Sequence, residues 1–207
     1  MIFIVEQHNY GKYSELIDDM FRLRARIFYD RLRWDVQVTD GKERDKYDDE
    51  GPVYLIYADK ARREVKGSLR LLPTTGPTLL ADFFSDTRPD ALDLTAPTIW
   101  ECTRFCVDQH ILGKGQEQEL LVTSTTMIAA VGELALKAGI ESILSNLDST
   151  MLRLCRRVGC EVEVLGSTHR YGRPVHLGLF PISKAILRRV GERLNIRAAD
   201  RKCLLLN

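Results

Sequence analysis

The sequence of 207 residues has no long uninterrupted apolar run, and its first residues lack the basic segment of a secretory signal. We therefore expect no membrane span and no exported precursor. Charge is balanced, with 30 Lys and Arg against 29 Asp and Glu, which gives no case for nucleic-acid binding. The five cysteines form no C-x-x-C pair and the four histidines no H-E-x-x-H motif, so we expect reduced thiols, a cytoplasmic location and no metal site.

An apolar share of 44% and a charged share of 29% are typical of a folded globular chain, and the length favours one domain over residues 1–207. The sequence predicts strands at residues 2–5, 53–58, 65–72, 98–107, 140–147, 161–165 and 175–180. It predicts helices at residues 14–30 (with Ser14 as N-cap), 79–84, 116–138, 150–158 and 183–194. Residues 33–51 are predicted to be irregular. This alternation favours an α/β (α+β) fold, with a central sheet covered by helices on both faces.

Charge is unevenly distributed along the chain. Residues 151–207 hold 12 Lys and Arg and 4 Asp and Glu, whereas residues 1–150 hold 18 and 25. The basic part includes the last predicted helix and the tail, residues 181–207. Such a distribution is usually a solvated surface, but it would also suit a docking surface for an acidic partner.

One arginine falls on the apolar side of the first predicted helix. Met20, Arg24 and Phe28 are spaced four apart and therefore share a face. A buried guanidinium is costly without a carboxylate partner, so Arg24 either finds one or extends to water at the edge of the face. The polar segment that follows contains Asp45 and Asp48, which would share a side if a helical turn forms there.

Two later predicted strands carry further charged residues. Arg70 lies on the polar face of the earlier strand. In the later one, Glu101 shares its face with apolar side chains, where a carboxylate tends to have a raised pKa and suits a general base. A structural salt bridge to Arg70 or Arg24 is the alternative. A regular strand puts Glu101 and Arg104 on opposite faces, and a bulge between them would bring both to one face.

Together these residues carry a family resemblance. The sequence resembles the LuxI-type N-acyl-homoserine lactone synthases, and especially their rhizobial branch, from the N-terminus to about residue 180. The signature-like segments are residues 23–28, 44–48, 70–74 and 100–105. Nine positions match in order and spacing: Arg24, Phe28, Trp34, Asp45, Asp48, Arg70, Phe84, Glu101 and Arg104.

The resemblance implies an enzyme that makes quorum-sensing signals. It would transfer an acyl group from acyl-carrier protein, or from acyl-coenzyme A, to the amine of S-adenosylmethionine. It would then close the lactone with release of methylthioadenosine. Both molecules are substrates, so no cofactor is implied. The implied fold is GNAT-like, a three-layer sandwich with a bulged mixed sheet.

The resemblance also implies roles for individual residues. Glu101 would be the catalytic base, with Arg104 and Arg70 as further catalytic residues. A mobile lid, residues 33–50, would order when substrate binds. The residues expected to bind S-adenosylmethionine are Arg24, Phe28, Trp34, Asp45, Asp48, Phe84, Arg104 and Phe105. The expected acyl pocket comprises Leu69, Leu121, Met127, Ser145, Leu147 and Leu152, where the Ser145 hydroxyl would suit a 3-oxo chain. Carrier-protein docking would use Arg153, Arg156 and Arg157.

Two alternatives stay open at this point. The loop at residues 110–115 resembles the GNAT pyrophosphate loop, with His110 where Arg or Gln is usual, which favours an N-acetyltransferase that uses acetyl-coenzyme A. A ligand-sensing or partner-binding protein with a degenerate site is the non-enzyme alternative. The charged set around Arg24, Asp45 and Asp48 argues against both.

Overall fold

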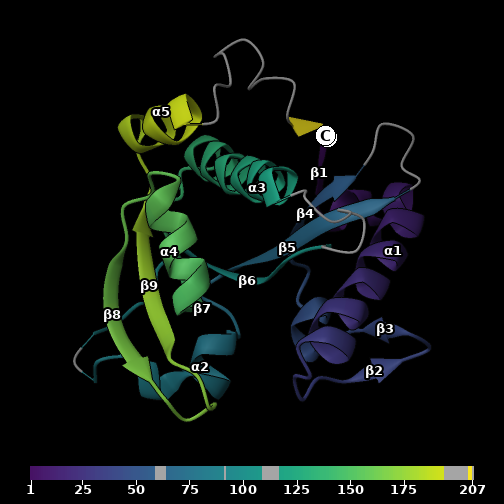
Figure 1. The fold of residues 1–207 in the computed structure, drawn as a ribbon, viewed down its shortest axis with the longest axis horizontal. Coiled ribbons are helices and arrows are strands. Elements are labelled where there is room, and N and C mark those ends of the chain that lie inside the picture. The colour runs from purple at the N-terminus through teal and green to yellow at the C-terminus, as the bar shows by residue number, and fades with distance from the viewer. Residues whose placement is uncertain (59–63, 91, 109–116, 194–204, 207) are drawn as a thin grey trace. The chain divides into compact units, whose positions relative to one another are not determined.

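A computed structural model describes residues 1–58, 64–90, 92–108, 117–193 and 205–206 (Figure 1). The strands are β1 (Ile2–Val5), β2 (Val38–Thr39), β3 (Lys42–Glu43), β4 (Val53–Ala58), β5 (Val65–Pro73), β6 (Ile99–Val107), β7 (Ser142–Asp148), β8 (Glu163–Thr168), β9 (Val175–Pro181) and β10 (Leu205–Leu206). The α-helices are α1 (Ser14–Arg24), α2 (Leu79–Phe83), α3 (Glu117–Lys137), α4 (Ser149–Arg157) and α5 (Lys184–Arg193). Shorter helical segments are η1 (Gln7–Tyr13), η2 (Ala25–Arg31), η3 (Lys46–Asp49) and η4 (Ser85–Thr87).

Eight strands hydrogen-bond in the order β10-β1-β4-β5-β6-β7-β9-β8, and β2 and β3 form a separate hairpin. The sheet is mixed: β6 and β7 are parallel, whereas β9 is antiparallel to both β7 and β8. A mixed sheet accompanied by helices confirms the predicted α/β class.

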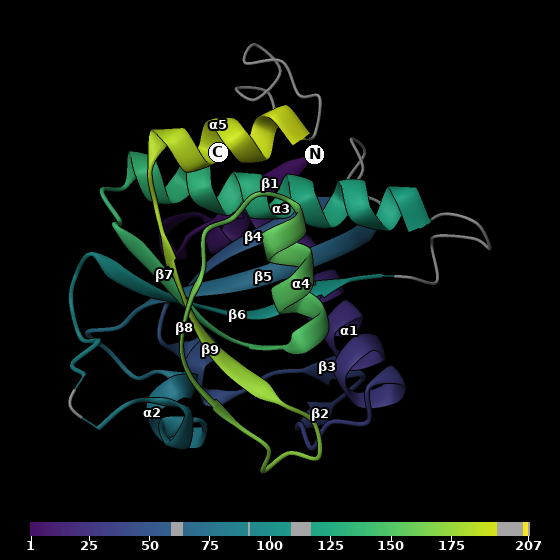
Figure 2. The same cartoon turned by 60° about the vertical axis from the view of Figure 1, so that its left-hand side comes forward.

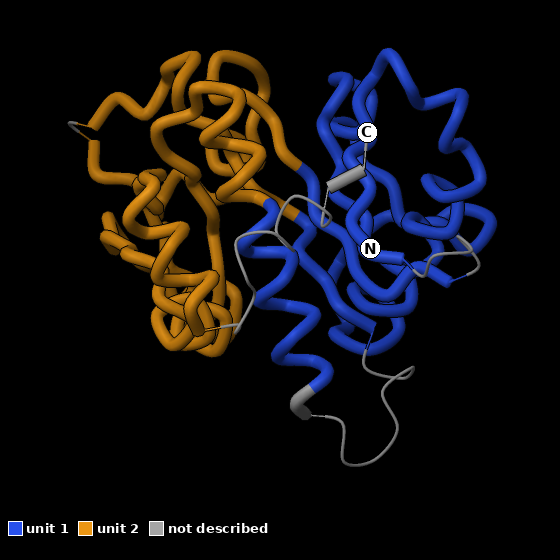
Figure 3. Tube along the Cα trace, turned by 90° about the horizontal axis from the view of Figure 1, so that it is seen from above, with its two compact units in different colours: residues 1–70, 104–130, 199–207 blue, residues 71–103, 131–198 orange. Residues whose placement is uncertain are grey.

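The described chain divides into two compact units, which Figure 3 colours separately. Unit 1 comprises residues 1–70, 104–130 and 199–207, and unit 2 comprises residues 71–103 and 131–198. Each unit combines segments that are distant in the sequence. The prediction of a single domain stays a prediction.

In unit 1, one side of α1 packs against β1 and β4. Leu16, Met20 and Leu23 from the helix are buried with Phe3 and Ile56 from the strands. Figure 2 shows α1 and α3 on opposite sides of β4. The spacing of apolar residues in α1 explains why this helix forms, since it buries a continuous stripe.

In unit 2, β7 pairs with both β6 and β9, and its residues Ile143, Leu144 and Leu147 are buried. Leu144 and Leu177 from the sheet form a core with Leu80 and Leu94. The helix α4 packs on β7 and β9. Its N-cap is Asp148, whose carboxylate accepts hydrogen bonds from the backbone N–H groups of Thr150 and Met151.

Three local predictions were wrong. Ser14 is the first residue of α1 rather than its N-cap, because η1 leads directly into the helix through Tyr13. The predicted helix at residues 14–30 changes at Ala25 into a π-helix, η2. The segment at residues 33–51 is not irregular throughout, since it contains the hairpin β2–β3 and the 3-10 helix η3. In addition, β10 was not predicted.

The helix α3 qualifies the expectation of no membrane span. Residues Glu119–Lys137 are long and apolar enough to cross a bilayer by length and composition, with a mean hydropathy of 1.4. The sequence shows no uninterrupted apolar run here because Ser124 and neighbouring threonines lie between the apolar residues. However, 44% of this window is buried in the protein, and a core helix passes the same test. The loop at residues 110–115 lies outside the described residues.

Candidate active site

The end of α1 carries the arginine that the sequence placed on an apolar face. Arg24 is buried, with 1% of its surface exposed, and its guanidinium lies over the Phe21 ring. The π-helix η2 follows at once and contains Phe28. Because π-helical turns are rare and occur frequently at functional sites, the change of helix type at Ala25 marks this region as a candidate site.

The hairpin β2–β3 delivers a carboxylate that sequence analysis did not identify. Asp40 and Gly41 both have positive φ angles, 52° and 73°, as a two-residue type I′ turn requires. The turn brings the chain back so that Glu43, on β3, is completely buried. A Lys42–Asp18 ion pair, 2.5 Å between Nζ and Oδ2, links the hairpin to α1.

The 3-10 helix η3 brings the two predicted aspartates to one side. The Asp45 carboxylate accepts a hydrogen bond from the Tyr47 N–H at 3.0 Å. The Asp48 carboxylate accepts one from the Asp45 N–H at 2.9 Å. This reciprocal capping fixes both side chains. The prediction that a helical turn would make Asp45 and Asp48 share a side is confirmed.

Strands β5 and β6 supply two more arginines, Arg70 and Arg104. Arg70 is 1% exposed. Arg104 has a φ angle of 54°, in the left-handed region that non-glycine residues rarely adopt. The regular strand alternation therefore breaks at Arg104, as the predicted bulge requires.

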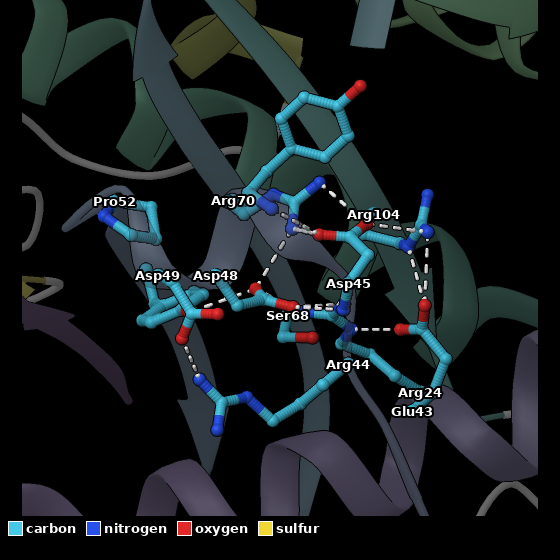
Figure 4. A network of polar contacts seen from close by, with 12 residues as sticks. Arg24, Glu43, Arg44, Asp45, Asp48, Asp49, Pro52, Ser68, Arg70 and Arg104 are labelled. Atoms are coloured by element: carbon cyan, nitrogen blue, oxygen red, sulfur yellow. Dashed lines mark hydrogen bonds and ion pairs between the residues drawn. The ribbon is translucent and has the colours of Figure 1, made fainter. Parts of the chain in front are cut away.

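These six residues form a closed ring of alternating charges (Figure 4). Arg24 binds Glu43 through Nε at 2.5 Å and binds both oxygens of Asp48 at 2.8 and 2.9 Å. Arg70 bridges Asp48, at 2.9 Å, and Asp45. Arg104 completes the ring, with its Nη2 2.7 Å from Asp45 Oδ2 and 3.0 Å from Glu43 Oε1. Three guanidinium groups and three carboxylates thus cancel one another's formal charges.

The ring holds Arg24, Asp48 and Arg70 in the ionised form. Burial alone would lower the pKa of Arg24, but Glu43 and Asp48 outweigh it and raise this pKa well above its usual value. The pKa of Arg70 is also raised, because hydrogen bonds to Asp45 and the charge of Asp48 outweigh burial. Burial would raise the pKa of Asp48, but Arg24 and Arg70 hold it well below its usual range. Each of these three groups stays charged because its partners carry the opposite charge.

Exposure divides the ring into an inner and an outer part. The side chains of Arg24, Glu43, Asp48 and Arg70 are at most 1% exposed. The outer part consists of Arg104, at 9%, and Asp45, at 18%. Only the outer part therefore presents a charged surface to a ligand in this structure.

Aromatic rings line the ionic ring. Phe28 and Trp34 stack with centroids 4.9 Å apart, and the Arg104 guanidinium lies over the Phe28 ring. Trp34 is about half exposed, and its backbone N–H donates to the Phe28 backbone carbonyl. The Tyr54 hydroxyl donates to Asp48 at 2.9 Å, and burial together with the Asp48 charge raises the pKa of Tyr54.

Glu101 and Phe84 belong to unit 2. The Glu101 carboxylate is 2% exposed and accepts hydrogen bonds from the backbone N–H groups of Leu79 and Leu80, at 2.9 and 2.7 Å. Phe84 packs against the Tyr171 ring. Along β6, Glu101 precedes Arg104 by three residues, and Phe105 follows it, half-buried.

The residues expected in the acyl pocket fall in both units. Leu69, Leu121 and Met127 belong to unit 1, where Leu69 and Met127 are buried. Ser145, Leu147 and Leu152 belong to unit 2. The Ser145 hydroxyl donates a 2.9 Å hydrogen bond to the Cys102 carbonyl. The residues expected to dock a carrier protein, Arg153, Arg156 and Arg157, are exposed on α4.

Sequence analysis missed two members of the network, Glu43 and Tyr54. The dipeptide Asp40-Gly41 is a turn signal that would have placed Glu43 on a hairpin strand, on the same side as Asp45 two residues later. Nothing local in the sequence points to Tyr54. Among the residues that the structure describes, no three His, Cys, Asp or Glu side chains gather as a metal site.

Comparison with known proteins identifies relatives of this chain. The autoinducer synthase family model matches residues 8–190. An acyl-homoserine-lactone synthase of Rhizobium etli is 39% identical over 167 residues, which cover 80% of this chain and 77% of the relative. One of Agrobacterium fabrum is 32% identical over 190 residues, covering 91% and 90%.

Solved structures agree with the sequence relatives. A CoA-dependent acyl-homoserine lactone synthase, BjaI, solved with MTA, matches with a TM-score of 0.86 at 26% identity, covering all of this chain and 92% of BjaI. A second BjaI structure contains SAM and isopentyl-CoA and has a TM-score of 0.84. A putative N-acetyltransferase from Lactobacillus plantarum, with a TM-score of 0.56 and 16% identity, shares the fold alone and supports the GNAT-like prediction. On these matches, the chain belongs to the autoinducer synthase family.

Proposed function

We propose that the protein is an acyl-homoserine-lactone synthase that uses S-adenosylmethionine. The amine of this substrate attacks the carbonyl carbon of an acyl thioester, and the thiol leaves. The substrate carboxylate then attacks the γ-carbon, the bond from that carbon to the sulfonium sulfur breaks, and methylthioadenosine leaves. The observation that carries the proposal is the closed ionic ring in a chain of this family. An acetyl-coenzyme A-dependent N-acetyltransferase is disfavoured because that reaction has no need of the ring.

Arg104 is our candidate for binding the substrate carboxylate. Its Nε and Nη2 atoms bind Glu43 and Asp45. Its Nη1 atom makes no hydrogen bond or ion pair among the described residues. A guanidinium held from one side in this way keeps a donor free for an incoming carboxylate. Asp45, the more exposed carboxylate of the ring, suits the cationic part of the substrate.

The inner part of the ring has a different role in this proposal. Arg24, Glu43, Asp48 and Arg70 are too deeply buried to contact a substrate in this conformation. We therefore treat Arg24, Asp48 and Arg70, which the family resemblance associates with binding or catalysis, as positioning residues. They hold Arg104 and Asp45 in a fixed geometry, which lowers the cost of orienting the substrate.

Glu101 is the proposed base. The substrate ammonium must lose a proton before its nitrogen can attack, and a positioned carboxylate can accept that proton directly or through a water. The two backbone hydrogen bonds to Glu101 support the role, because they fix its orientation. For Glu101→Gln we expect kcat to fall by roughly 10²- to 10⁴-fold, the usual contribution of such a base. Unchanged turnover would remove Glu101 from the mechanism.

The stacked pair Phe28 and Trp34 is proposed to cover the nucleoside side of the substrate. Phe84 is proposed to line the site, and Phe105 to take part in binding S-adenosylmethionine. Trp34 supports this role because its ring is already ordered on Phe28 yet half exposed. Only part of the proposed lid at residues 33–50 is exposed, and its buried part restricts how the lid can move. Asp48 is locked into the ionic ring, so closing motions would involve mainly the exposed part around Trp34.

The acyl chain is proposed to contact Leu69, Leu121, Met127, Ser145, Leu147 and Leu152. Ser145 is the residue proposed to recognise the substituent at carbon 3 of the acyl chain. Its hydroxyl donates to the Cys102 carbonyl, so a 3-oxo group would have to replace this acceptor to receive the same proton. Mass spectrometry of the lactones, comparing the wild type with Ser145→Ala, tests the assignment through the ratio of 3-oxo to unsubstituted products.

The acyl donor is proposed to be a thioester of acyl-carrier protein, with acyl-coenzyme A as the second candidate. The exposed Arg153, Arg156 and Arg157 support an acidic protein partner, because charge complementarity speeds such encounters. The coenzyme A donor is favoured by the CoA-dependent relative BjaI. Rates with the same acyl group on each carrier decide between them, and a loss of rate at high salt with the carrier protein only would indicate electrostatic docking. A cytoplasmic location is proposed as well, and the free thiols of Cys102, Cys106, Cys155 and Cys160 support it.

The decisive experiment is mass spectrometry of culture extracts after expression in a host that makes no lactone signal. We expect an acyl-homoserine lactone from the wild type and from Arg44→Ala, whose arginine is adjacent to Asp45 in the sequence but outside the ring. With purified protein, Arg104→Ala should lower kcat/KM for S-adenosylmethionine by roughly 10- to 100-fold, since charged hydrogen bonds contribute about 1.5–3 kcal/mol. No lactone from the wild type with any donor would overturn the proposal.

A further inference from the structure

The end of α4 brings two cysteines together. Gly159 follows the helix with a φ angle of 100°, a conformation suited to glycine. The Cys160 N–H donates to the Cys155 carbonyl at 3.0 Å, and the Gly159 N–H donates to the Arg156 carbonyl at 3.1 Å. These two bonds define a Schellman motif, in which the side chains of its first and last residues usually touch. Here those residues are Cys155 and Cys160.

The two cysteines have different environments. Their interaction with each other raises the pKa of Cys155, as burial also does, and lowers that of Cys160. Cys155 is buried, whereas Cys160 is partly exposed. Arg189 and Arg193 pack over the intervening Gly159. A thiol that is partly accessible and has a lowered pKa is the reactive kind.

We propose that Cys155 and Cys160 form a peroxide-sensitive dithiol, a modification site that closes to a disulfide and is reopened by cellular thiols. The inference does not rest on the proposed synthase activity. Its basis is the backbone motif, in which the residues at these two positions frequently pack against each other.

The chemistry follows from the order of reactivity. The Cys160 thiolate attacks one oxygen of a hydroperoxide, the O–O bond breaks, and Cys160 becomes a sulfenic acid while water or an alcohol leaves. The Cys155 sulfur then attacks the Cys160 sulfur, the S–O bond breaks, and the hydroxyl leaves as water with the Cys155 proton. Two thiols lose two electrons and the peroxide gains them. A small-molecule thiol restores both cysteines by exchange through a mixed disulfide.

The test uses the full-length, fully reduced protein and hydrogen peroxide at a small molar excess. Intact-mass spectrometry should show a loss of 2 Da, and peptide mapping should join Cys155 to Cys160. Dithiothreitol should return the original mass. Cys106, which is buried and has its pKa raised by that burial, provides an internal control and should stay reduced.

Three variants keep the proposal falsifiable. Cys160→Ser should slow peroxide consumption at least tenfold, whereas Cys203→Ser, which removes a thiol outside the described residues, should leave the disulfide unchanged. Gly159→Ala strains the motif, because a β-carbon there would lie 3.3 Å from Arg189 Cγ at an unfavourable φ, and should slow disulfide formation with both thiols present. A disulfide that joins Cys155 to Cys102 instead, or equal oxidation of Cys106, would overturn the inference.

Discussion

Two arginine–aspartate pairs whose aspartates, Asp48 and Asp49, are adjacent in the sequence differ mainly in their exposure. Arg24 and Asp48 approach to 2.8 Å, and Arg44 and Asp49 approach to 2.6 Å. The side chains of the first pair are at most 1% exposed, whereas those of the second are 51% and 74% exposed. The distance between the charged atoms therefore does not distinguish an ion pair of the site from an ion pair of the surface. The burial of the two side chains does.

The number of partners differs as well. Asp48 also accepts hydrogen bonds from Arg70, Tyr54 and the Asp45 N–H, so all its polar capacity is used inside the protein. A buried carboxylate of this kind costs free energy to desolvate, and removing any of its partners leaves a buried charge unpaired, which costs more. The exposed pair competes with water and with its own side-chain entropy, and gains little. Altering one member of each pair in turn should expose this contrast.

The largest effect should come from removing Asp48. In Asp48→Ala, Arg24 and Arg70 lose a buried counter-charge, and breaking a buried pair in this way typically costs about 3–5 kcal/mol. We expect that loss in the free energy of unfolding, measured by urea titration. Asp49→Ala is the matched control, and equal losses in both variants would contradict the contrast.

Acid should weaken the same pair. Since the folded-state pKa of Asp48 lies below its unfolded value of about 4, Asp48 contributes stability above pH 4 and loses it as the pH falls further. The free energy of unfolding should therefore decline below pH 4 more steeply for the wild type than for Asp48→Asn. Parallel curves for the two proteins would show that Asp48 titrates alike in both states.

A smaller, kinetic effect should distinguish the inner and outer parts of the ring. Glu43 touches Arg24 and Arg104 but is fully buried, so Glu43→Gln should act on substrate through Arg104. We expect the KM for S-adenosylmethionine to rise roughly tenfold, the effect of about 1.4 kcal/mol, with the KM for the acyl thioester unchanged. If both constants rise together, the role of Glu43 is merely structural. Glu43→Asp, which keeps the charge but is one methylene shorter, should restore part of the affinity.

The sequence predicted individual elements where the pattern was local. The strand at residues 53–58 matches β4, because a run of apolar and aromatic residues between turn signals defines it. The need of Arg24 for a carboxylate was also predictable, since its position on an apolar face made the charge costly. In both cases the physical reason lies within a few residues.

The parts that were missed depend on distant or unusual geometry. Glu43 binds Arg104, 61 residues away, and the hairpin that delivers it has strands of only two residues each, too short for a period to be visible. The π-helix at Ala25–Arg31 keeps the apolar face of the preceding helix, so periodicity alone predicts continuation. The pairing of Cys155 with Cys160 depends on how the helix α4 ends, and the spacing of the cysteines alone does not reveal that.

The smallest expected effect concerns the exposed pair itself. A double-mutant cycle of Arg44→Ala and Asp49→Ala isolates its interaction energy, which should be about 0.2–1 kcal/mol because water and salt screen both groups. The value should shrink further in 0.5 M salt, where surface charges more than a few ångströms apart no longer interact. An interaction energy as large as that of a buried pair would mean that the ionic ring extends to Arg44. In that case the exposure of side chains would not define the edge of the ring. A coupling near zero, with unchanged lactone synthesis, would place that boundary between Arg44 and Asp45.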